Sequence, residues 1–211
     1  WEPSRGYATN GGVVSLSNLT SIGSSIELQA LTGATTPIFQ PAQVNGLSAL
    51  YFNGSTSDQS LDANWTNFGP WELFAVIAFT NHTAANTRLF SGRYSGHLWS
   101  VQWSDATKIF TIGTSVSLPT CLAITNRYFV FDLVFQPPSS STAYTNNISG
   151  VVGDAGTALA ADGLRIGLTE TGTANSRMSL ACLFTFTNQV LSSAQRLLAY
   201  QYCTNRFSLS P

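Results

Sequence analysis

The chain is poor in charge and in sulfur. Only 9% of its 211 residues are charged, and the formal net charge is -1. Such a surface offers no electrostatic footprint for nucleic acid or an anionic membrane, so the sequence predicts neither partner. No apolar run approaches the roughly eighteen residues that a membrane-spanning helix needs, so we expect no membrane span.

Cysteine is scarce as well. The three cysteines, Cys121, Cys182 and Cys203, are too few for a disulfide framework and lack metal-ligand spacing. At most one bridge can form, with Cys182 and Cys203 as the better pair. Three buried free thiols are an equally good interpretation.

Closely spaced carboxylates are also missing. Glycoside hydrolysis usually needs two carboxyl groups on either side of the scissile bond, and the only close pair, Asp58 and Asp62, lies in a polar turn. His82 and His97 have no Ser or Cys motif beside them, which disfavours nucleophilic catalysis. The sequence therefore predicts that the protein is not an enzyme, with a glycoside hydrolase as the lesser alternative.

Short apolar or alternating segments between Gly, Asn, Ser and Pro clusters fill most of the chain. They predict an all-β fold, a two-sheet antiparallel β-sandwich of the jelly-roll kind, with residues 1–211 as one domain. The chain begins at Trp1, which favours an excised domain or a processed chain. The expected strands are 47–52, 71–79, 88–91, 97–103, 108–113, 128–135, 164–168 and 180–186.

One helix is expected, at the C-terminus. Ser192 and Gln195 have the spacing of a capping box, and the helical pattern continues to Tyr202. Ala194, Leu197 and Leu198, followed by Gln201 or Tyr202, fall on one face at helical spacing, so we expect this face to pack on the sandwich.

Three separated motifs, in order, resemble the laminin-G-like branch of the concanavalin A-like lectin/glucanase superfamily, over about Val14 to Phe207. The last motif is an apolar strand, an Asn turn, Leu-Ser and a helix ending in Tyr. The residues that carry the resemblance are Pro41, Asn45-Gly46, Leu50 to Gly54, Asp58 to Leu61, Trp71 to Phe79, Leu89 to Gly92, Leu180 to Phe186, Asn188, Leu191-Ser192 and Tyr200 or Tyr202.

The resemblance implies a carbohydrate-binding or adhesive module, because most domains of this fold are lectin-like and fewer are glycosidases. The glucanases carry alternating acids on one strand, and no such motif occurs here. Cys182 stands where relatives often keep an acid in the last strand, and Ser179 replaces a glycine before it. The resemblance therefore carries no polar site over to this end of the chain.

Sugar binding needs exposed aromatic faces together with polar groups for the hydroxyls. We expect Trp65, Tyr94, Trp99 and Trp103 to bind the ligand, because they lie in or beside loops or on a strand with one exposed face. Alternation places Trp99, Val101 and Trp103 on one side of that strand, where packing in the core is the alternative.

Calcium often accompanies this fold and needs several oxygen ligands. Asp58, Asp62 and Asn64 form the one compact oxygen-rich turn, so they are the candidate ligands. A solvated turn is the simpler interpretation, so we expect no cofactor.

Five N-glycosylation sequons begin at Asn18, Asn53, Asn64, Asn81 and Asn147. Asparagine, serine and threonine are so abundant that several of them would arise by chance.

The favoured function is an extracellular recognition module that binds a glycan or surface glycoprotein. The alternative is a structural or host-attachment protein on a virion, fibre or extracellular assembly, either self-assembling or part of a larger parent protein. Low charge and abundant Ser, Thr, Asn and Gly suit both, and both place the chain outside the cell or on a particle surface.

Overall fold

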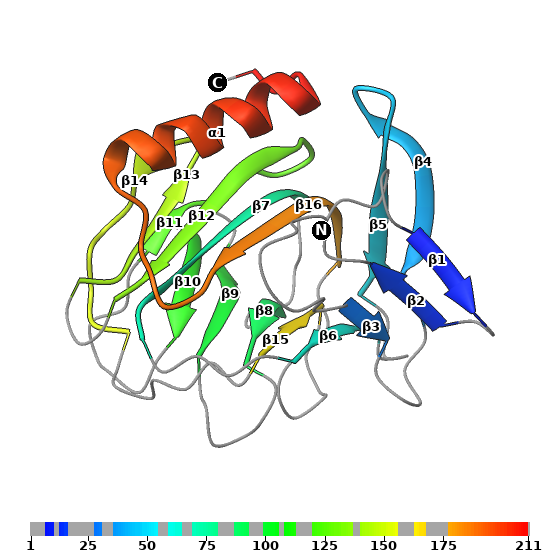
Figure 1. The fold of residues 1–211 in the computed structure, drawn as a ribbon, viewed down its shortest axis with the longest axis horizontal. Helices are drawn as coiled ribbons and strands as arrows, with labels where there is room; N and C mark the ends of the chain where they lie inside the picture. Colours follow the sequence, from blue (N-terminus) through cyan, green and yellow to red (C-terminus); the bar gives the residue numbers. More distant parts are fainter. Residues whose placement is uncertain are drawn as a thin grey trace.

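The computed structural model is a two-layer β-sandwich with one helix on its outer face (Figure 1). It describes residues 7–10, 13–16, 28–30, 36–54, 59–64, 69–79, 87–92, 99–105, 108–112, 120–136, 140–155, 163–167 and 177–210. All strand pairs within both sheets are antiparallel among these residues. The predicted fold class is confirmed.

One layer is a nine-stranded sheet in the order β1-β2-β3-β6-β15-β8-β9-β10-β11. Its strands are β1 (Tyr7–Asn10), β2 (Val13–Leu16), β3 (Leu28–Ala30), β6 (Leu61–Ala63), β8 (Thr87–Ser91), β9 (Ser100–Asp105), β10 (Lys108–Ile112), β11 (Thr120–Leu122) and β15 (Leu164–Ile166).

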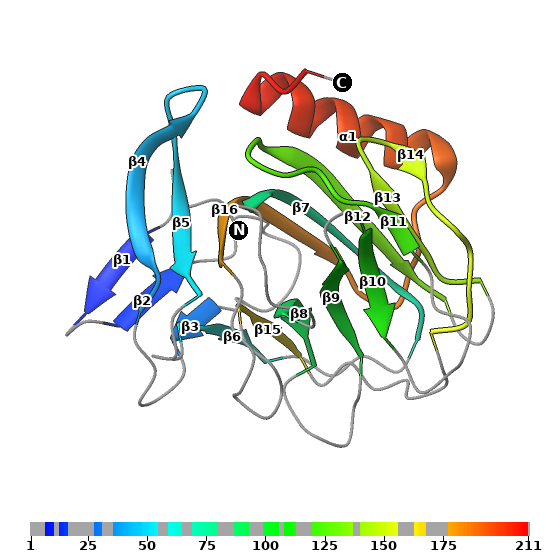
Figure 2. The ribbon, with the colours of Figure 1, turned by 180° about the vertical axis from the view of Figure 1, so that it is seen from behind.

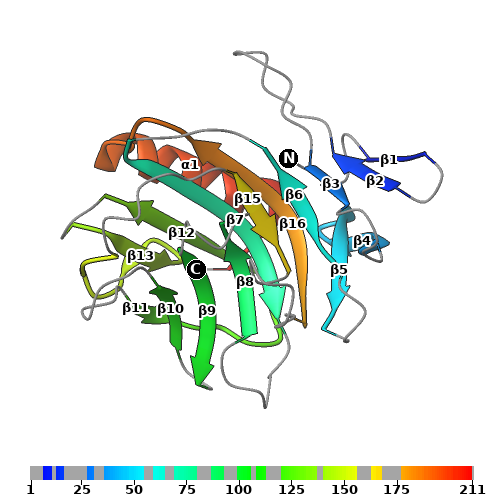
Figure 3. The ribbon, with the colours of Figure 1, turned by 90° about the horizontal axis from the view of Figure 1, so that it is seen from below.

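The other layer is a seven-stranded sheet in the order β14-β13-β12-β7-β16-β5-β4. Figure 3 shows β4 and β5 at the end of the molecule away from β11 and β13. The strands are β4 (Ile38–Val44), β5 (Leu47–Asn53), β7 (Trp71–Phe79), β12 (Phe129–Phe135), β13 (Thr142–Thr145), β14 (Ile148–Ser149) and β16 (Arg177–Phe186).

The central strand β7 explains why its sequence is almost continuously apolar. It pairs with β12 on one side and β16 on the other. Leu73, Ala75 and Ile77 face the core between the sheets, whereas Phe74 and Val76 face the helix. Since both faces are covered, neither set of alternating positions can be polar without a partner.

Two hairpins of the seven-stranded sheet are closed by residues with positive φ. Asn45 and Gly46 join β4 to β5, and Asn146 and Asn147 join β13 to β14. A two-residue turn with φ above zero at both positions matches the right-handed twist of paired strands, which explains the choice of Asn and Gly.

Helix α1 (Ser193–Phe207) lies across the outer face of the seven-stranded sheet, over β12 and β13 (Figures 1 and 2). The predicted capping box is present at Ser192 and Gln195. The predicted packing face is wrong, because Leu197, Leu198 and Tyr202 are exposed; the buried helix residues are Cys203 and Phe207. The sheet presents two carboxyl groups to the first turn of the helix, and Arg196 turns inward to meet them.

All three cysteines are buried free thiols. Cys182 and Cys203 pack in the apolar cluster between the sheet and α1, and Cys121 lies in the core between the sheets. Burial raises the pKa of the Cys121 thiol to about 11, against the opposing effect of its hydrogen bond with Thr145. The interpretation as free thiols is the one the structure supports.

No helix in the described part of the chain is long and apolar enough to cross a membrane.

Candidate functional site

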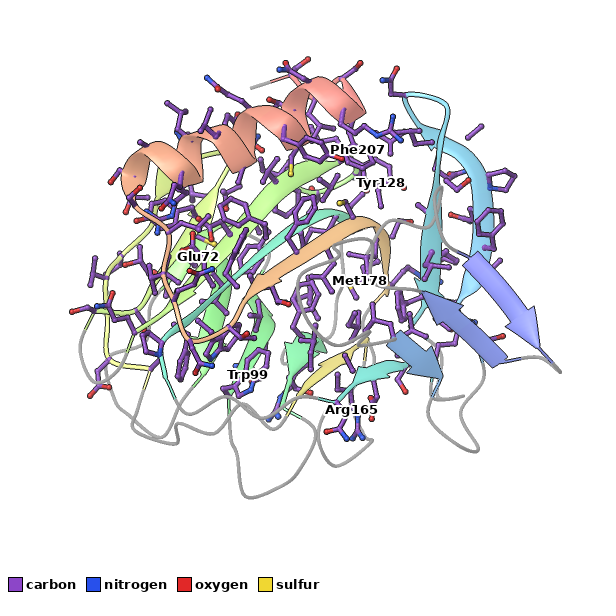
Figure 4. The ribbon with its side chains drawn as sticks, viewed as in Figure 1. Glu72, Trp99, Tyr128, Arg165, Met178 and Phe207 are labelled. Carbon is purple, nitrogen blue, oxygen red and sulfur yellow. The ribbon has the colours of Figure 1, made fainter. Side chains whose placement is uncertain are left out.

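Trp99 does not offer an aromatic face to solvent. It is 2% exposed and lies in the core, where its ring meets that of Trp71 edge to face at 4.6 Å (Figure 4). The alternation of the strand was predicted correctly for Trp99 and Val101, but their shared side is the core side. The prediction that Trp99 binds sugar is therefore wrong.

The other three predicted aromatic residues are only partly covered by the structure. Trp65 and Tyr94 lie outside the described residues. The backbone of Trp103 pairs with Ile109 and Thr87 within the nine-stranded sheet, and its side chain lies outside the described part.

Asp62, one of the three predicted calcium ligands, has both carboxylate oxygens engaged. Arg165 on the neighbouring strand donates from Nε to Oδ1 and from Nη2 to Oδ2, each at 2.9 Å. Both side chains are buried, and the two donor nitrogens of the guanidinium match the two oxygens of the carboxylate. A cation at Asp62 would have to displace this pair, which disfavours the predicted site.

The remaining ligands give the calcium prediction no support. Asn64 is exposed beyond the end of β6, and Asp58 lies outside the described residues. The described residues contain no group of three or more His, Cys, Asp or Glu side chains that could hold a metal ion. The calcium site stays a prediction.

Three of the five sequons fall in the described structure. Asn64 and Asn147 are exposed, the latter at the turn between β13 and β14, and Asn53 is half-buried at the end of β5. Asn18 and Asn81 lie outside the described residues. Whether the sequons carry sugar stays a prediction.

A buried charged cluster joins α1 to the sheet, and the sequence did not predict it. Glu72 on β7 accepts from Arg196 Nε at 2.8 Å and from the Leu191 amide at 2.7 Å. The same Nε lies 3.0 Å from Oδ2 of Asp132 on β12, and the guanidinium lies 5.1 Å from the centroid of the Tyr144 ring. We call Glu72, Asp132 and Arg196 the helix clip; Figure 4 labels its Glu72, below the start of α1.

Burial changes the protonation of Asp132 within the helix clip. Burial, followed by the nearby charge of Glu72, raises the pKa of Asp132 well above its ordinary value. A proton held on Asp132 reduces the negative charge buried beside Arg196, which is the direction that burial favours.

The sequence carried a weak signal for this pair of acids. Glu72 is opposite Val134, and Asp132 is opposite Phe74, so the two carboxyl groups are diagonal neighbours on one face of the sheet. Each is the one acid within a run of apolar residues. Only the pairing of the two runs, which a single sequence does not reveal, brings them together.

A row of partly exposed residues crosses the outer face of the seven-stranded sheet, at the end away from the helix clip. In register across neighbouring strands lie Ile38 on β4, Tyr51 on β5, Ser179 on β16 and Ala78 on β7. Tyr128, which directly precedes β12, continues the row because Phe129 pairs with Ile77. We call Tyr51, Ser179, Ala78 and Tyr128 the tyrosine ledge.

Strand parity places the ledge on the outer face. Leu50, Phe52, Met178 and Phe129 belong to the core between the sheets, so the residues next to them point the other way. All four ledge residues are half-buried. With strands about 4.8 Å apart, the ledge spans about 14 Å from Tyr51 to Tyr128.

The ledge has aromatic ends and a small polar middle. Ser179 and Ala78 have short side chains, so two tyrosine rings border a low central strip. The side chains of Tyr128 and Ser179 share a hydrogen bond, while burial raises the pKa of the Tyr128 hydroxyl, which stays neutral. The β4–β5 hairpin and α1 border this part of the sheet on either side (Figures 1 and 2).

Arginines flank the ledge. Arg177 lies two residues before Ser179 on the same face of β16, is exposed, and donates from Nε to the Asn53 carbonyl at 3.3 Å. Gly54, with φ +66, lets the chain turn tightly there, because a Cβ at this position would lie 3.0 Å from the Arg177 Cβ. Arg127, next to Tyr128, is also exposed.

Comparison with known proteins places the fold but no family. No protein-family model matches the chain, and no curated protein matches it either. Among solved structures it is similar to Trypanosoma rangeli sialidase in complex with 2,3-difluoro-KDN, with 12% identity and a TM-score of 0.60, over 92% of this chain and 33% of that one.

Binding domains of botulinum neurotoxins are similar as well. The serotype G domain is 11% identical with a TM-score of 0.61, over 95% of this chain and 50% of that one. The neurotoxin DC domain in complex with SialylT is 7% identical with a TM-score of 0.64, over 92% of this chain and 49% of that one. This chain thus spans between a third and half of the length of these structures. At such identities the similarity shows a shared β-sandwich fold.

Proposed function

We propose that this chain is a non-catalytic carbohydrate-recognition module that holds a saccharide on the tyrosine ledge. We further propose that it belongs to the laminin-G-like branch of the concanavalin A-like superfamily and acts outside the cell or on a particle surface. The three ordered sequence motifs and the confirmed sandwich with its terminal helix support this assignment.

The observation that carries the proposal is the composition of the ledge. A pyranose ring has an apolar face that packs on an aromatic ring and hydroxyls that need hydrogen-bond partners. Tyr51 and Tyr128 supply two half-buried rings, and Ser179 lies between them in the row. In the described structure this row brings both kinds of group together on a partly exposed stretch of the outer sheet face.

The comparisons support a binding role without deciding it. One similar neurotoxin binding domain is in complex with SialylT, and another, with a TM-score of 0.62, is in complex with rat synaptotagmin II. The similar sialidases are enzymes, so the fold alone allows either role.

The positions of the described acids favour binding over hydrolysis. Glu72 and Asp132 are close together, but α1 covers them and Arg196 binds them. The Asp62 carboxylate is engaged by Arg165. None of these carboxyl groups lies on the ledge, where a pair would be needed to act on a saccharide bound there.

A glycan array probed with the purified chain tests this function, followed by titration of the best saccharide. We expect Tyr51→Ala and Tyr128→Ala to weaken binding. Tyr202→Ala, which removes a partly exposed tyrosine from α1, is the matched control and should leave binding unchanged. Equal affinity for all three variants, or no saccharide bound, would overturn the proposal.

A specific observation also favours a structural role as the second candidate. Leu122, Ile148, Val151 and Val152 are each more than half exposed, on or beside the edge strands β11 and β14. The outer face of α1 adds Leu197 and Leu198, without any charged residue among its exposed positions. Exposed apolar residues at this density are typical of subunit contacts.

Sedimentation of the purified chain over a range of concentrations tests the structural role. A concentration-dependent assembly that Ile148→Ser together with Leu198→Ser abolishes would support it. A monomer at all concentrations would contradict it while leaving the recognition module in place.

A further inference from the structure

We infer that the tyrosine ledge selects acidic saccharides, those carrying a carboxylate or a sulfate, over neutral ones. This inference rests on the proposed function of the ledge. It goes beyond it by assigning the ligand class and the residues, Arg177 and Arg127, that recognise the anionic group.

The first observation is a local imbalance of charge in a chain whose net charge is almost zero. On the seven-stranded layer the described acids on the strands are Glu72 and Asp132, and both are taken up by the helix clip at the far end of the face. Arg127 and Arg177 are left exposed beside the ledge. No described carboxylate balances them there.

The end of α1 lies close to the same part of the sheet. Arg206 lies in the last turn of α1, next to Phe207, and Phe207 packs in the apolar cluster that Tyr128 joins. The carbonyl of Arg206 accepts from the Asn45 side chain at the tip of the β4–β5 hairpin. The hairpin tip and the end of the helix are therefore joined beside the part of the sheet where Tyr128 lies.

The second observation is the placement of Arg177. It shares a face of β16 with Ser179, two residues away, which corresponds to about 7 Å along the strand. Its Nε is held by the Asn53 carbonyl, so the guanidinium has further N–H donors available for a ligand. An anionic group on a sugar ring packed against Tyr51 or Ser179 lies within reach of this side chain.

A guanidinium suits this role because its planar donors match a carboxylate or a sulfate in a bidentate geometry. A neutral hydroxyl gains much less from the same side chain. The ledge would thus take the ring by packing and the acid by Arg177, with Arg127 adding attraction from the opposite end.

Isothermal titration of the full chain with three probes tests the inference: lactose, 3′-sialyllactose and a 3′-sulfated lactose. We expect both acidic probes to bind about tenfold more tightly than lactose at low salt. Added salt should weaken them and leave lactose unchanged, because the arginines are exposed. The two acidic probes show whether carboxylate, sulfate or both are accepted.

Substitutions then locate the effect. Arg177→Gln should cost the acidic probes about fivefold to tenfold and leave lactose unchanged, and Arg127→Gln should cost them less. Arg88→Gln, on β8 of the other sheet, is the control for loss of one arginine and should change nothing. Tyr51→Ala should weaken all three probes.

The outcomes separate this inference from the proposed function. Equal affinity for lactose and the acidic probes would overturn the inference and leave a neutral-sugar module. Acid-selective binding that survives both Arg177→Gln and Arg127→Gln would also overturn the assignment to these arginines. No binding of any saccharide would overturn the function itself.

Discussion

The outer face of the seven-stranded sheet has two differently used ends, although the same strands run through both. At one end α1 covers Glu72 and Asp132, and every charge there has a partner within the helix clip. At the other end Tyr51, Ser179 and Tyr128 are half-buried, and Arg127 and Arg177 are exposed. Charged side chains are thus paired with one another where the helix covers the sheet, and arginine side chains are exposed at the other end.

The difference shows which parts of α1 contact the sheet. Its first turn is held by the clip and its last turn by Cys203 and Phe207 in the apolar cluster. Between them, Leu197, Leu198 and Tyr202 face outward. The helix ends beside the β4–β5 hairpin, where the Asn45 side chain donates to the Arg206 carbonyl, and the ledge residues remain only partly buried.

The largest expected effect comes from breaking the clip. Arg196→Met removes the cation from two buried carboxyl groups and should destabilise the chain by about 3–5 kcal/mol, the cost of an uncompensated buried charge. Urea denaturation followed by circular dichroism measures it. Adding Glu72→Gln to this variant should recover much of the loss, and a single-variant loss below about 1 kcal/mol would contradict the role of the clip.

The protonation of Asp132 makes the stability of the sheet end under α1 depend on pH. Because its folded pKa is raised, the folded state holds a proton that the unfolded chain releases above about pH 4. The contribution of this retained proton to the free energy of unfolding is fully present below that pH and is lost as the pH rises toward the folded pKa. The free energy of unfolding then falls by up to about 1.4 kcal/mol per pH unit.

Asp132→Asn should therefore flatten the decline of stability with rising pH, as seen in urea titrations between about pH 4 and pH 8. The other titratable groups close to Asp132 are Glu72, Arg196, Tyr144 and Cys121, and all of them stay in place in this variant. A variant that keeps the slope of the unmodified chain would show that Asp132 is ionised in the fold.

Substitutions in the tyrosine ledge should change saccharide affinity and not the free energy of unfolding. Tyr51→Ala removes one half-exposed ring, so saccharide affinity should fall about two- to tenfold, the size of one aromatic contact. The free energy of unfolding should change by less than about 1 kcal/mol, because the ring is only half-buried. Calorimetric titration and urea denaturation of the same sample measure both, and a stability loss without a binding loss would assign Tyr51 to packing alone.

Much of the fold could be predicted because its signals are local. The apolar run from Trp71, the Asn-Gly turn at Asn45 and the capping box at Ser192 each specify one element by short-range chemistry. The packing face of α1 could not be predicted from its own residues. The helical pattern favours Leu197 and Leu198 as the packing residues. The sheet instead presents carboxyl groups to α1, and Arg196 faces the sheet because it pairs with them.

The candidate site was harder to predict for the same reason. The residue type and the alternation of the strand favour Trp99 as a binding residue, yet alternation does not say which side of a strand is the core. Tyr51, Ser179 and Tyr128 are far apart in the chain and meet only through strand register. In the sequence Ser179 stands out only as a departure from a glycine, and in the structure its hydroxyl lies on the outer face of the sheet.

The smallest expected effect concerns the cap of the helix at the covered end. Ser192 Oγ accepts from the Gln195 amide at 3.4 Å, and the Ser192 amide donates to Gln195 Oε1 at 2.9 Å. Ser192→Ala should cost about 0.5–1 kcal/mol, at the low end for a cap, because the Leu191 amide and Arg196 hold the same turn through Glu72. Ser193→Ala, at the neighbouring exposed position, is the control and should cost less. A loss near 2 kcal/mol would mean that the cap, and not the clip, fixes the start of α1, whereas no loss would mean that the clip alone suffices.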